Sequence, residues 1–285
     1  MTGSRWEKTW DQRIERAREL AAAHPFAAEG LRFYERIASF QKSLYGGLLA
    51  GRSTERTPRM PQTPGSLRDE LELLILLPWF ASFLSFVQDI APPPLAQSAA
   101  ALSAAGGTRW EEVLDEFWRA GVQDAAPLTE AEALIAWTFL QPYAEVLADR
   151  TARLDGGAEV HGTPPLCPLC AGRPLVGVLR PLGDGAKRSL VCSLCATEWE
   201  YRRLVCAACG EESVDKLPVY VAEGAEELDH VRVEACDTCR HYIKTIDLTK
   251  NGRAVPVVDE LAAIPLSLWA AENGYTKVST NLLGL

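Results

Sequence analysis

Apolar side chains recur at helical spacing through the first 155 residues of the chain. The clearest stripe has four members spaced i, i+4, i+7 and i+11, namely Phe33, Ile37, Phe40 and Leu44. It predicts a helix over about 29–45. A longer apolar segment covers 67–90 and follows Ser66, a residue type that caps helix N-termini. The pattern predicts helices that bury their apolar faces against one another.

Two later helices are expected to begin with a capping box, in which a threonine precedes a glutamate by three residues: Thr108 with Glu111, and Thr129 with Glu132. Stretches rich in glycine and proline at 46–65 and 91–107 are expected to be loops. Each flanking helix has one apolar face that needs a partner, so these loops lie within one domain.

The pattern changes after 154–165, a glycine- and proline-containing stretch that is typical of a hinge. Beyond it, short β-branched and aromatic segments alternate with turn residues, which predicts strands in small hairpins. The expected strands are 175–179, 217–221, 231–235 and 242–248. The last stretch, from Asp259 to Leu285, is apolar again and is expected to pack back on the domains.

Composition and charge limit the functional classes to which this protein can belong. Hydrophobic residues make up 47% and charged residues 24% of 285, which is ordinary for a globular chain. The formal net charge is −9, and acidic residues outnumber basic ones in both halves. A nucleic-acid binder would carry a basic face, so no nucleic-acid partner is expected.

No membrane segment is expected. The charged N-terminus, 1–18, lacks the apolar core of a secretory signal. The longest uncharged apolar stretch, 73–87, has 15 residues and contains Pro78, which is short of a spanning helix and typical of a buried core helix. A cytoplasmic location is therefore expected.

All eight cysteines lie in four CxxC pairs: Cys167 and Cys170, Cys192 and Cys195, Cys206 and Cys209, Cys236 and Cys239. The gaps between successive pairs are 21, 10 and 26 residues. The two long gaps fit the hairpin of a zinc-ribbon or rubredoxin-like site, and the short gap fits a junction between sites. The first two pairs are thus expected to form site 1 and the last two site 2. Spacing also leaves a crossed arrangement open.

Glycine and aromatic residues repeat with the cysteines. Gly172 and Gly210 follow the opening pair of each site, where a turn is expected to need a positive φ. Trp199 and Tyr242 follow the closing pairs. This repeat favours the uncrossed pairing.

Four pairs in a reducing compartment indicate metal ligation rather than disulfides. A thioredoxin-like redox pair needs a helix that starts at the motif, whereas Cys167 follows two prolines and precedes Gly-Arg-Pro. Each site is expected to hold one tetrahedral ion, iron or zinc, with four thiolates and no open position, as in a closed structural site.

These observations predict an α+β protein, a helical N-terminal domain followed by two tandem rubredoxin-like or zinc-ribbon β modules. The expected boundaries are 1–160 for the all-α domain, 161–203 for the first metal module, and 204–285 for the second with its C-terminal extension.

The cysteine-rich strings resemble a known family. CPLC, CSLCATEWEYRRLVCAAC and EACDTCRHYIKTIDL are similar to the formate dehydrogenase accessory protein FdhE family, as are the N-terminal RARELAAAHPFAAEGLRFYERIASFQ and the segment around Pro256. Two departures are the second acidic residue of a paired-aspartate motif, Glu260 here, and a tail that ends in NLLGL. They affect expectations about the tail, not about the metal sites.

The resemblance implies a cytoplasmic maturation factor that binds the catalytic subunit of respiratory formate dehydrogenase before export. It also implies rubredoxin-like sites for iron as well as zinc. Candidate partner contacts are Glu198, Trp199, Arg202, Arg203, Tyr242, Lys244 and Asp259. The alternative for these residues is a local role under the metal loops.

Two other functions are compatible with part of this pattern. The first is a rubredoxin-like electron carrier or redox enzyme that acts on the active site of the client. The second is a zinc-ribbon nucleic-acid binder, which the acidic charge disfavours. None of the four histidines, at 24, 161, 230 and 241, lies in a known catalytic motif, so no catalytic residue and no enzymatic turnover are expected. The sequence does not determine the oligomeric state.

Overall fold

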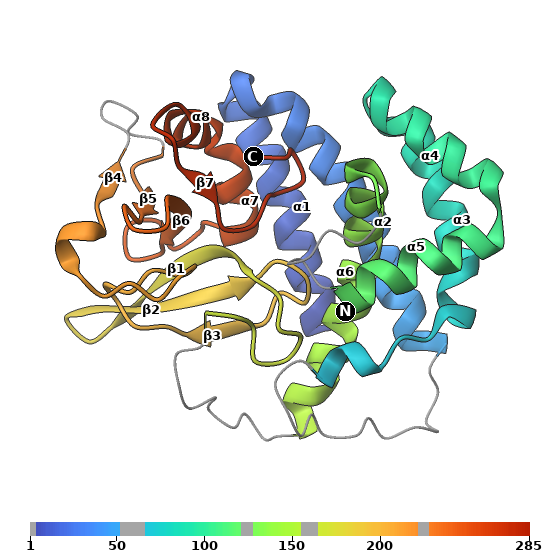
Figure 1. Cartoon of the computed structure of the whole chain (residues 1–285), viewed down its shortest axis with the longest axis horizontal. Helices are drawn as coiled ribbons and strands as arrows, with labels where there is room; N and C mark the ends of the chain where they lie inside the picture. The colour runs from blue at the N-terminus through green and yellow to red at the C-terminus, as the bar shows by residue number, and fades with distance from the viewer. Residues whose placement is uncertain (1–3, 52–65, 121–127, 155–164, 222–227) are drawn as a thin grey trace.

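The computed structural model describes residues 4–51, 66–120, 128–154, 165–221 and 228–285. Helices occupy one side of the molecule and a twisted sheet the other, with two C-terminal helices above the sheet (Figure 1). The expected hinge at 154–165 lies almost entirely outside the described residues. The α+β class is confirmed.

Six α-helices form the described N-terminal part: α1 (Arg5–Ala23), α2 (Ala28–Gly51), α3 (Leu73–Ile90), α4 (Pro93–Ala105), α5 (Gly107–Ala120) and α6 (Glu130–Leu154). Short 3₁₀ turns cover Pro25–Ala27 and Ser66–Asp69. The Thr129–Glu132 capping box is confirmed, because the Glu132 amide donates to Thr129 Oγ1 at 3.2 Å and the Thr129 amide donates to Glu132 at 3.0 Å.

Two expected loops are partly wrong. The first six residues of 46–65 continue α2, where a Cβ on Gly47 would lie 2.4 Å from the Trp79 ring. Glycine is therefore used there for close helix packing rather than for a turn. Within 91–107 the proline run starts α4 instead of preventing it, since proline is well suited to the first helical turn. Thr108 is the second residue of α5, not its cap.

Helix α3 is partly buried rather than fully buried. Among the described helices, it alone is long and apolar enough to cross a membrane, and 28% of its residues are buried. Its inner face packs in the helical core, where the Phe80 and Phe139 rings lie 4.8 Å apart. Its outer face exposes Leu74. One face thus belongs to the core, which is typical of a helix in a packed bundle.

The described strands form one mixed sheet in the order β3-β2-β1-β6-β5-β4, and β7 also pairs with β6. They are β1 (Pro174–Leu182), β2 (Gly185–Cys192), β3 (Glu198–Glu200), β4 (Val219–Val221), β5 (Val231–Ala235), β6 (His241–Asp247) and β7 (Thr276–Lys277). A 3₁₀ turn covers Val214–Lys216. All four predicted strands are present.

The two cysteine modules share this sheet. Strand β1 of the first module runs parallel to β6 of the second, with Gly177 opposite Thr245. A Cβ on Gly177 would lie 2.3 Å from Thr245 Oγ1, so the two strands approach closely only because residue 177 is glycine. The modules expected in tandem are therefore joined edge to edge. The domain boundaries of 161–203 and 204–285 remain a prediction.

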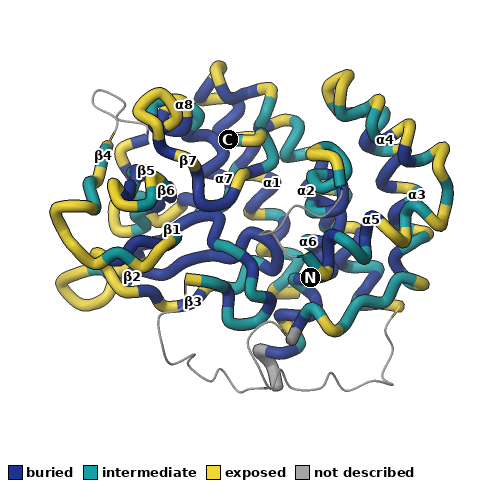
Figure 2. The backbone as a smooth tube through the Cα atoms, viewed as in Figure 1, coloured by how far each residue is buried: buried dark blue, intermediate teal, exposed yellow. Residues whose placement is uncertain are grey.

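Helices α7 (Pro256–Ala262) and α8 (Ile264–Glu272) connect the sheet to the helical part. Val258, Leu261 and Ala262 of α7 pack with α1 and the start of α2 in one apolar cluster. Figure 2 shows buried residues in α1, α7 and β1, and exposed residues near β4 and at the β1–β2 turn. The site regions thus sit on a sheet whose one end is covered and whose other end faces solvent.

Candidate metal centres

The eight cysteines form two groups of four. The first group is Cys167, Cys170, Cys192 and Cys195, and the second is Cys206, Cys209, Cys236 and Cys239. Within each group all sulfur atoms lie within 4.8 Å of one another. The structure thus brings together the predicted ligands in the uncrossed arrangement.

The sulfur spacing suits a tetrahedral metal ion. Two sulfur–sulfur distances are 3.3 and 3.6 Å in the first group, and two are 3.7 and 3.8 Å in the second. Four thiolates at metal–sulfur distances of about 2.3 Å would lie roughly 3.8 Å apart. A disulfide would need about 2.05 Å, and all eight cysteines are free. The groups are candidate metal centres, site 1 and site 2.

The same backbone loop presents each cysteine pair. In all four loops the amide of the first cysteine donates to the carbonyl five residues ahead, as from Cys167 to Gly172 at 2.8 Å and from Cys236 to His241 at 2.9 Å. The residue after the second cysteine has a positive φ in every loop: Ala171 (55°), Ala196 (52°), Gly210 (78°) and Arg240 (59°). This left-handed residue turns the chain so that both sulfurs point to one centre.

Gly172 has a different role from the one expected. The left-handed residue of its loop is Ala171, whereas a Cβ on Gly172 would lie 3.1 Å from the sulfurs of both Cys170 and Cys192. Glycine leaves room for the sulfur group there. The expectation of a positive φ is confirmed at Gly210 and wrong at Gly172.

Backbone amides are directed at several sulfurs. Those of Gly172 and Leu194 lie 3.4 Å from Cys170 Sγ and Cys192 Sγ, and that of Ala208 lies 3.3 Å from Cys206 Sγ. Such contacts stabilise negative charge on a thiolate. Four thiolates carry four negative charges, and a divalent ion neutralises only two of them. The amide contacts help to stabilise the remaining charge.

Burial opposes ionisation of the thiols when no cation is bound. It raises the pKa of Cys192 and Cys195 well above the usual value, and it also raises the pKa of Cys206 and Cys239. Hydrogen bonds from the neighbouring thiols, first that of Cys167, lower the pKa of Cys170. A bound cation would supply the charge that several buried thiolates need together.

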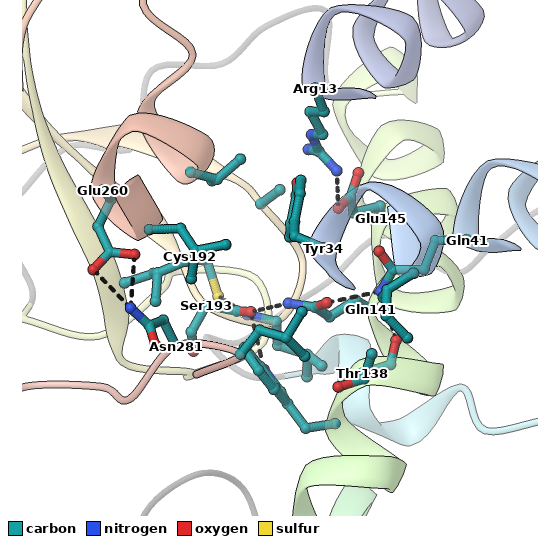
Figure 3. Close-up of a pocket in the computed structure, with 18 residues that line it drawn as sticks. Arg13, Tyr34, Gln41, Thr138, Gln141, Glu145, Cys192, Ser193, Glu260 and Asn281 are labelled. Atoms are coloured by element: carbon teal, nitrogen blue, oxygen red, sulfur yellow. Dashed lines mark hydrogen bonds and ion pairs between the residues drawn. The ribbon is translucent and has the colours of Figure 1, made fainter. Parts of the chain in front are cut away.

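Site 1 is buried and belongs to the core. All four of its cysteines are members of the large apolar cluster that includes α2, α3 and α6. Helix α6 contacts it through Trp137 and Gln141, whose side chains donate to the Ser193 carbonyl at 3.1 and 2.9 Å (Figure 3). Arg68 donates to the Cys170 carbonyl at 2.7 Å. Site 1 therefore connects the helical part to the sheet.

A partly open cavity with about 560 Å³ of empty space, solvent-facing space included, lies at this junction. Figure 3 shows Tyr34, Gln41 and Ser193 around it, with Arg13 paired to Glu145 at 2.8 Å. Burial raises the pKa of Tyr34 to about 12, so its hydroxyl is protonated at neutral pH. This polar lining could not be predicted from the sequence, because helical periodicity identifies the faces of each helix but not which faces of different helices pack together.

Site 2 is more open than site 1. Cys206 and Cys236 are buried, whereas Cys209 is exposed and Cys239 partly so. The apolar clusters of the described chain contain no cysteine of site 2. An ion at site 2 would be within reach of solvent and of a partner, unlike an ion at site 1.

Three of the predicted contact residues are exposed near the metal loops. Glu198 pairs with Arg180 through two bonds of 2.7 Å, and Arg202 pairs with Glu212 at 2.8 Å. Arg203 is exposed and makes no ion pair within the described part of the chain. These three remain available to a partner.

The other four predicted contacts are buried, which is incompatible with direct contact in this conformation. Trp199 lies in the large apolar cluster that also contains site 1, and Tyr242 lies in a second cluster on the sheet. Lys244 and Asp259 are 0% exposed. Their partners explain this position: the Lys244 ammonium lies 2.9 Å from Glu260, and Asp259 pairs with Arg16. In this structure all four side chains thus make their contacts within the fold.

The buried acidic pair of α7 has partners that the sequence analysis did not identify. Beyond Arg16, Asp259 lies 2.8 Å from His230 Nε2. Glu260 accepts from Lys277 and Asn281 in addition to Lys244. The signal in the sequence was two adjacent acids within an apolar segment, since buried charges need partners. No feature of the neighbouring sequence indicated which side chains would pair with these two acids.

Comparison with known proteins agrees with this arrangement. Residues 166–203 match the family model "FdhE, central domain" and residues 204–283 match "FdhE, C-terminal domain". The "Protein FdhE homolog" of Aquifex aeolicus is 29% identical over 223 residues, 78% of this chain and 74% of that protein. "Protein FdhE" of Escherichia coli O1:K1 / APEC is 25% identical over 284 residues, 97% and 88% of the two chains.

A solved structure is also similar over nearly its full length. The crystal structure of the FdhE protein from Pseudomonas aeruginosa superposes with a TM-score of 0.71 at 25% identity, covering 99% of this chain and 97% of that one. The superposition therefore includes the helical part, the sheet and the C-terminal helices. The chain is thus similar over nearly its whole length to proteins named FdhE, and its residues 166–283 match the FdhE central and C-terminal family models.

Proposed function

We propose that this protein is an accessory factor for the maturation of respiratory formate dehydrogenase. It binds the catalytic subunit of that enzyme in the cytoplasm before export, and it does so without catalytic turnover or contact with nucleic acid. Similarity to FdhE proteins supports the link to formate dehydrogenase, and the single structural observation that carries the proposal is the pair of closed four-cysteine groups on one sheet.

Closed ligand sets favour a binding role. A catalytic zinc normally keeps one coordination position for water or substrate, whereas four cysteines leave none. Site 1 would hold its ion through Cys167, Cys170, Cys192 and Cys195, and site 2 through Cys206, Cys209, Cys236 and Cys239. Both iron and zinc accept four thiolates in tetrahedral geometry. When bound, such an ion would cross-link the two cysteine loops of its site. An iron ion could also gain and lose one electron.

The direct test of the proposed function is deletion of the gene. Respiratory formate dehydrogenase activity should be lost while the enzyme's polypeptides remain detectable by immunoblotting. Activity should return with a plasmid copy of the wild-type gene. Unchanged activity in the deletion strain would refute the assignment.

The exposed side of site 2 favours a second candidate, a rubredoxin-like electron carrier acting on the active site of the client. Electron transfer needs a short path from metal to partner, and Cys209 lies at the surface. Metal analysis and an absorption spectrum of anaerobically purified protein separate the two candidates. Colourless protein that contains only zinc would exclude the carrier, and iron that cycles reversibly would support it.

A further inference from the structure

A groove lies beside site 2, and its lining includes arginine side chains whose charge or hydrogen-bond donors are not all paired within the described structure. It is open to solvent and contains about 650 Å³ of empty space, solvent-facing space included. We call it the Arg203 groove, and its walls include Arg188, Arg203, Leu204, Val219, Arg232 and Glu234. Cys206 of site 2 also lines it. An occupant of the groove would therefore touch the metal loop.

The groove is positively charged in an acidic protein. Arg188 and Arg232 both pair with Glu234, at 2.6 and 2.5 Å, and that carboxylate is the acidic side chain among the lining residues. Arg203 adds a further positive charge with no ion-pair partner in the described chain. Three arginines against one glutamate contrast with a net charge of −9 for the whole chain.

Arg188 leaves a donor unused. The residue is 4% exposed, and its Nε has no hydrogen-bond partner in the described structure. A buried guanidinium N–H without an acceptor costs free energy, so unpaired groups of this kind are rare unless a ligand or water fills the space. The Nε atom itself is buried, so Arg188 contributes charge to the groove wall rather than a donor that an occupant could reach.

Apolar residues are exposed at the groove and along the neighbouring strand. Leu204 is 57% exposed and has φ of 56°, a left-handed conformation that is unusual for a leucine. Val219 and Val221 of β4 are 50% and 55% exposed. Strand β4 ends the sheet, so no described strand pairs with its outer edge. An extended peptide can add to such an edge and place alternate side chains over one face.

We propose that the Arg203 groove and the edge of β4 bind an extended segment of a partner protein that carries apolar side chains and at least one carboxylate. Leu204 and Val219 contact the apolar side chains, and the exposed Arg203 faces the carboxylate. The segment lies against Cys206, which puts the partner next to site 2. The choice of partner, the catalytic subunit of formate dehydrogenase, rests on the proposed function.

The test uses overlapping peptides that cover this catalytic subunit, bound to purified, full-length, metal-loaded protein. Peptides that bind should contain an acidic residue beside apolar ones. Arg203→Glu and Leu204→Asn should each weaken binding about tenfold by fluorescence anisotropy, since both remove exposed contacts. Asn tolerates a left-handed backbone, so the second variant keeps the fold.

Two matched variants control for general surface effects. Leu182→Asn changes a leucine that is 64% exposed at the β1–β2 turn, and Arg253→Glu reverses an exposed charge outside the groove. Both should bind peptides like the wild type. Peptides enriched in lysine and arginine, no bound peptide, or unchanged affinity in both groove variants would overturn the proposal.

Failure of the groove and failure of the proposed function give different results. If gene deletion abolishes formate dehydrogenase activity but Arg203→Glu and Leu204→Asn restore it fully, the function stands and the groove proposal fails. If deletion has no effect, the function fails. If light scattering shows a wild-type dimer that Leu204→Asn converts to a monomer, a second copy of the chain occupies the groove, which also overturns the proposal.

Discussion

Arg16 on α1 and Asp259 on α7 are 243 positions apart in the sequence and form a two-bond ion pair. Arg16 Nη2 lies 2.6 Å from Asp259 Oδ1, and Arg16 Nε lies 3.0 Å from Oδ2. The carboxylate is fully buried and also contacts His230. This pair joins the first helix of the chain to the end of the sheet region.

Removal of the Asp259 carboxylate should strongly destabilise the protein. Asp259→Ala leaves the Arg16 guanidinium without its buried partner, and breaking such a pair typically costs about 3–5 kcal/mol. Chemical denaturation of the metal-loaded protein would measure the loss. Glu19→Ala, which removes only an exposed partner of Arg16, should cost less than about 1 kcal/mol. Equal effects of the two variants would contradict the importance of the buried pair.

The acidic pair of α7 should also make stability depend on pH. Burial alone would raise the pKa of Asp259, but hydrogen bonds from His230 and Arg16 lower it below its usual value. For Glu260, attraction to Lys244 and Lys277 likewise outweighs burial and lowers the pKa. Groups with lowered folded-state pKa values stabilise the fold above their unfolded pKa values of about 4.

The stabilisation from these carboxylates should therefore be complete above about pH 5 and lost as the pH falls through the folded-state values. Melting temperatures measured from neutral pH downward would show this loss. Because both proteins keep the same metal ligands, the difference between wild type and Asp259→Asn isolates the carboxylate. A difference that stays constant down to the lowest pH would contradict the mechanism.

Chelators should remove the ion of site 2 before that of site 1. Cys209 at site 2 is exposed, whereas all four cysteines of site 1 are buried in the core. Native mass spectrometry during treatment with EDTA should show a species with one ion per chain. Prior substitution of Cys209 by Ser should abolish the fast phase of release. A single phase, or release of the site 1 ion first, would contradict the prediction.

Loss of a ligand should affect folding more at site 1 than at site 2. Site 1 contacts α6 through the Ser193 carbonyl and lies in the shared core, so Cys170→Ser should disturb both halves. Structural four-cysteine sites contribute about 10–16 kcal/mol of apparent binding energy. We expect Cys170→Ser to yield mostly insoluble or protease-sensitive protein and Cys209→Ser to stay folded. Comparable protease resistance of the two variants would refute this order.

Gly177→Ala should separate β1 from β6. The added methyl would lie 2.3 Å from Thr245 Oγ1, an overlap that side chains in a packed sheet relieve at a cost of about 1–3 kcal/mol. Thermal denaturation would report the loss, and Thr245→Ala in the same chain should restore part of it. At Gly185 the nearest atom to an added Cβ is 3.8 Å away, so Gly185→Ala serves as the control.

The cysteine spacing, together with the repeat of glycine and aromatic residues, favoured the two groups and the pairing that the structure shows. A CxxC loop is local: its hydrogen bonds span five residues and its left-handed residue directly follows the second cysteine. The hairpin gap then determines which loops meet. The four predicted strands and the capping box at Thr129 follow from equally local signals, because alternation and capping depend on neighbours in the sequence.

Only the tertiary structure determined what surrounds these loops. The pairing of Gly177 with Thr245, which joins two modules into one sheet, and the burial of Asp259 against Arg16 involve residues far apart in the chain. Local periodicity identifies which residues prefer burial, but it does not identify the residues against which they pack. The sequence by itself thus determined the sulfur ligands and the class of fold, while long-range packing decided that site 1 is enclosed and site 2 is open.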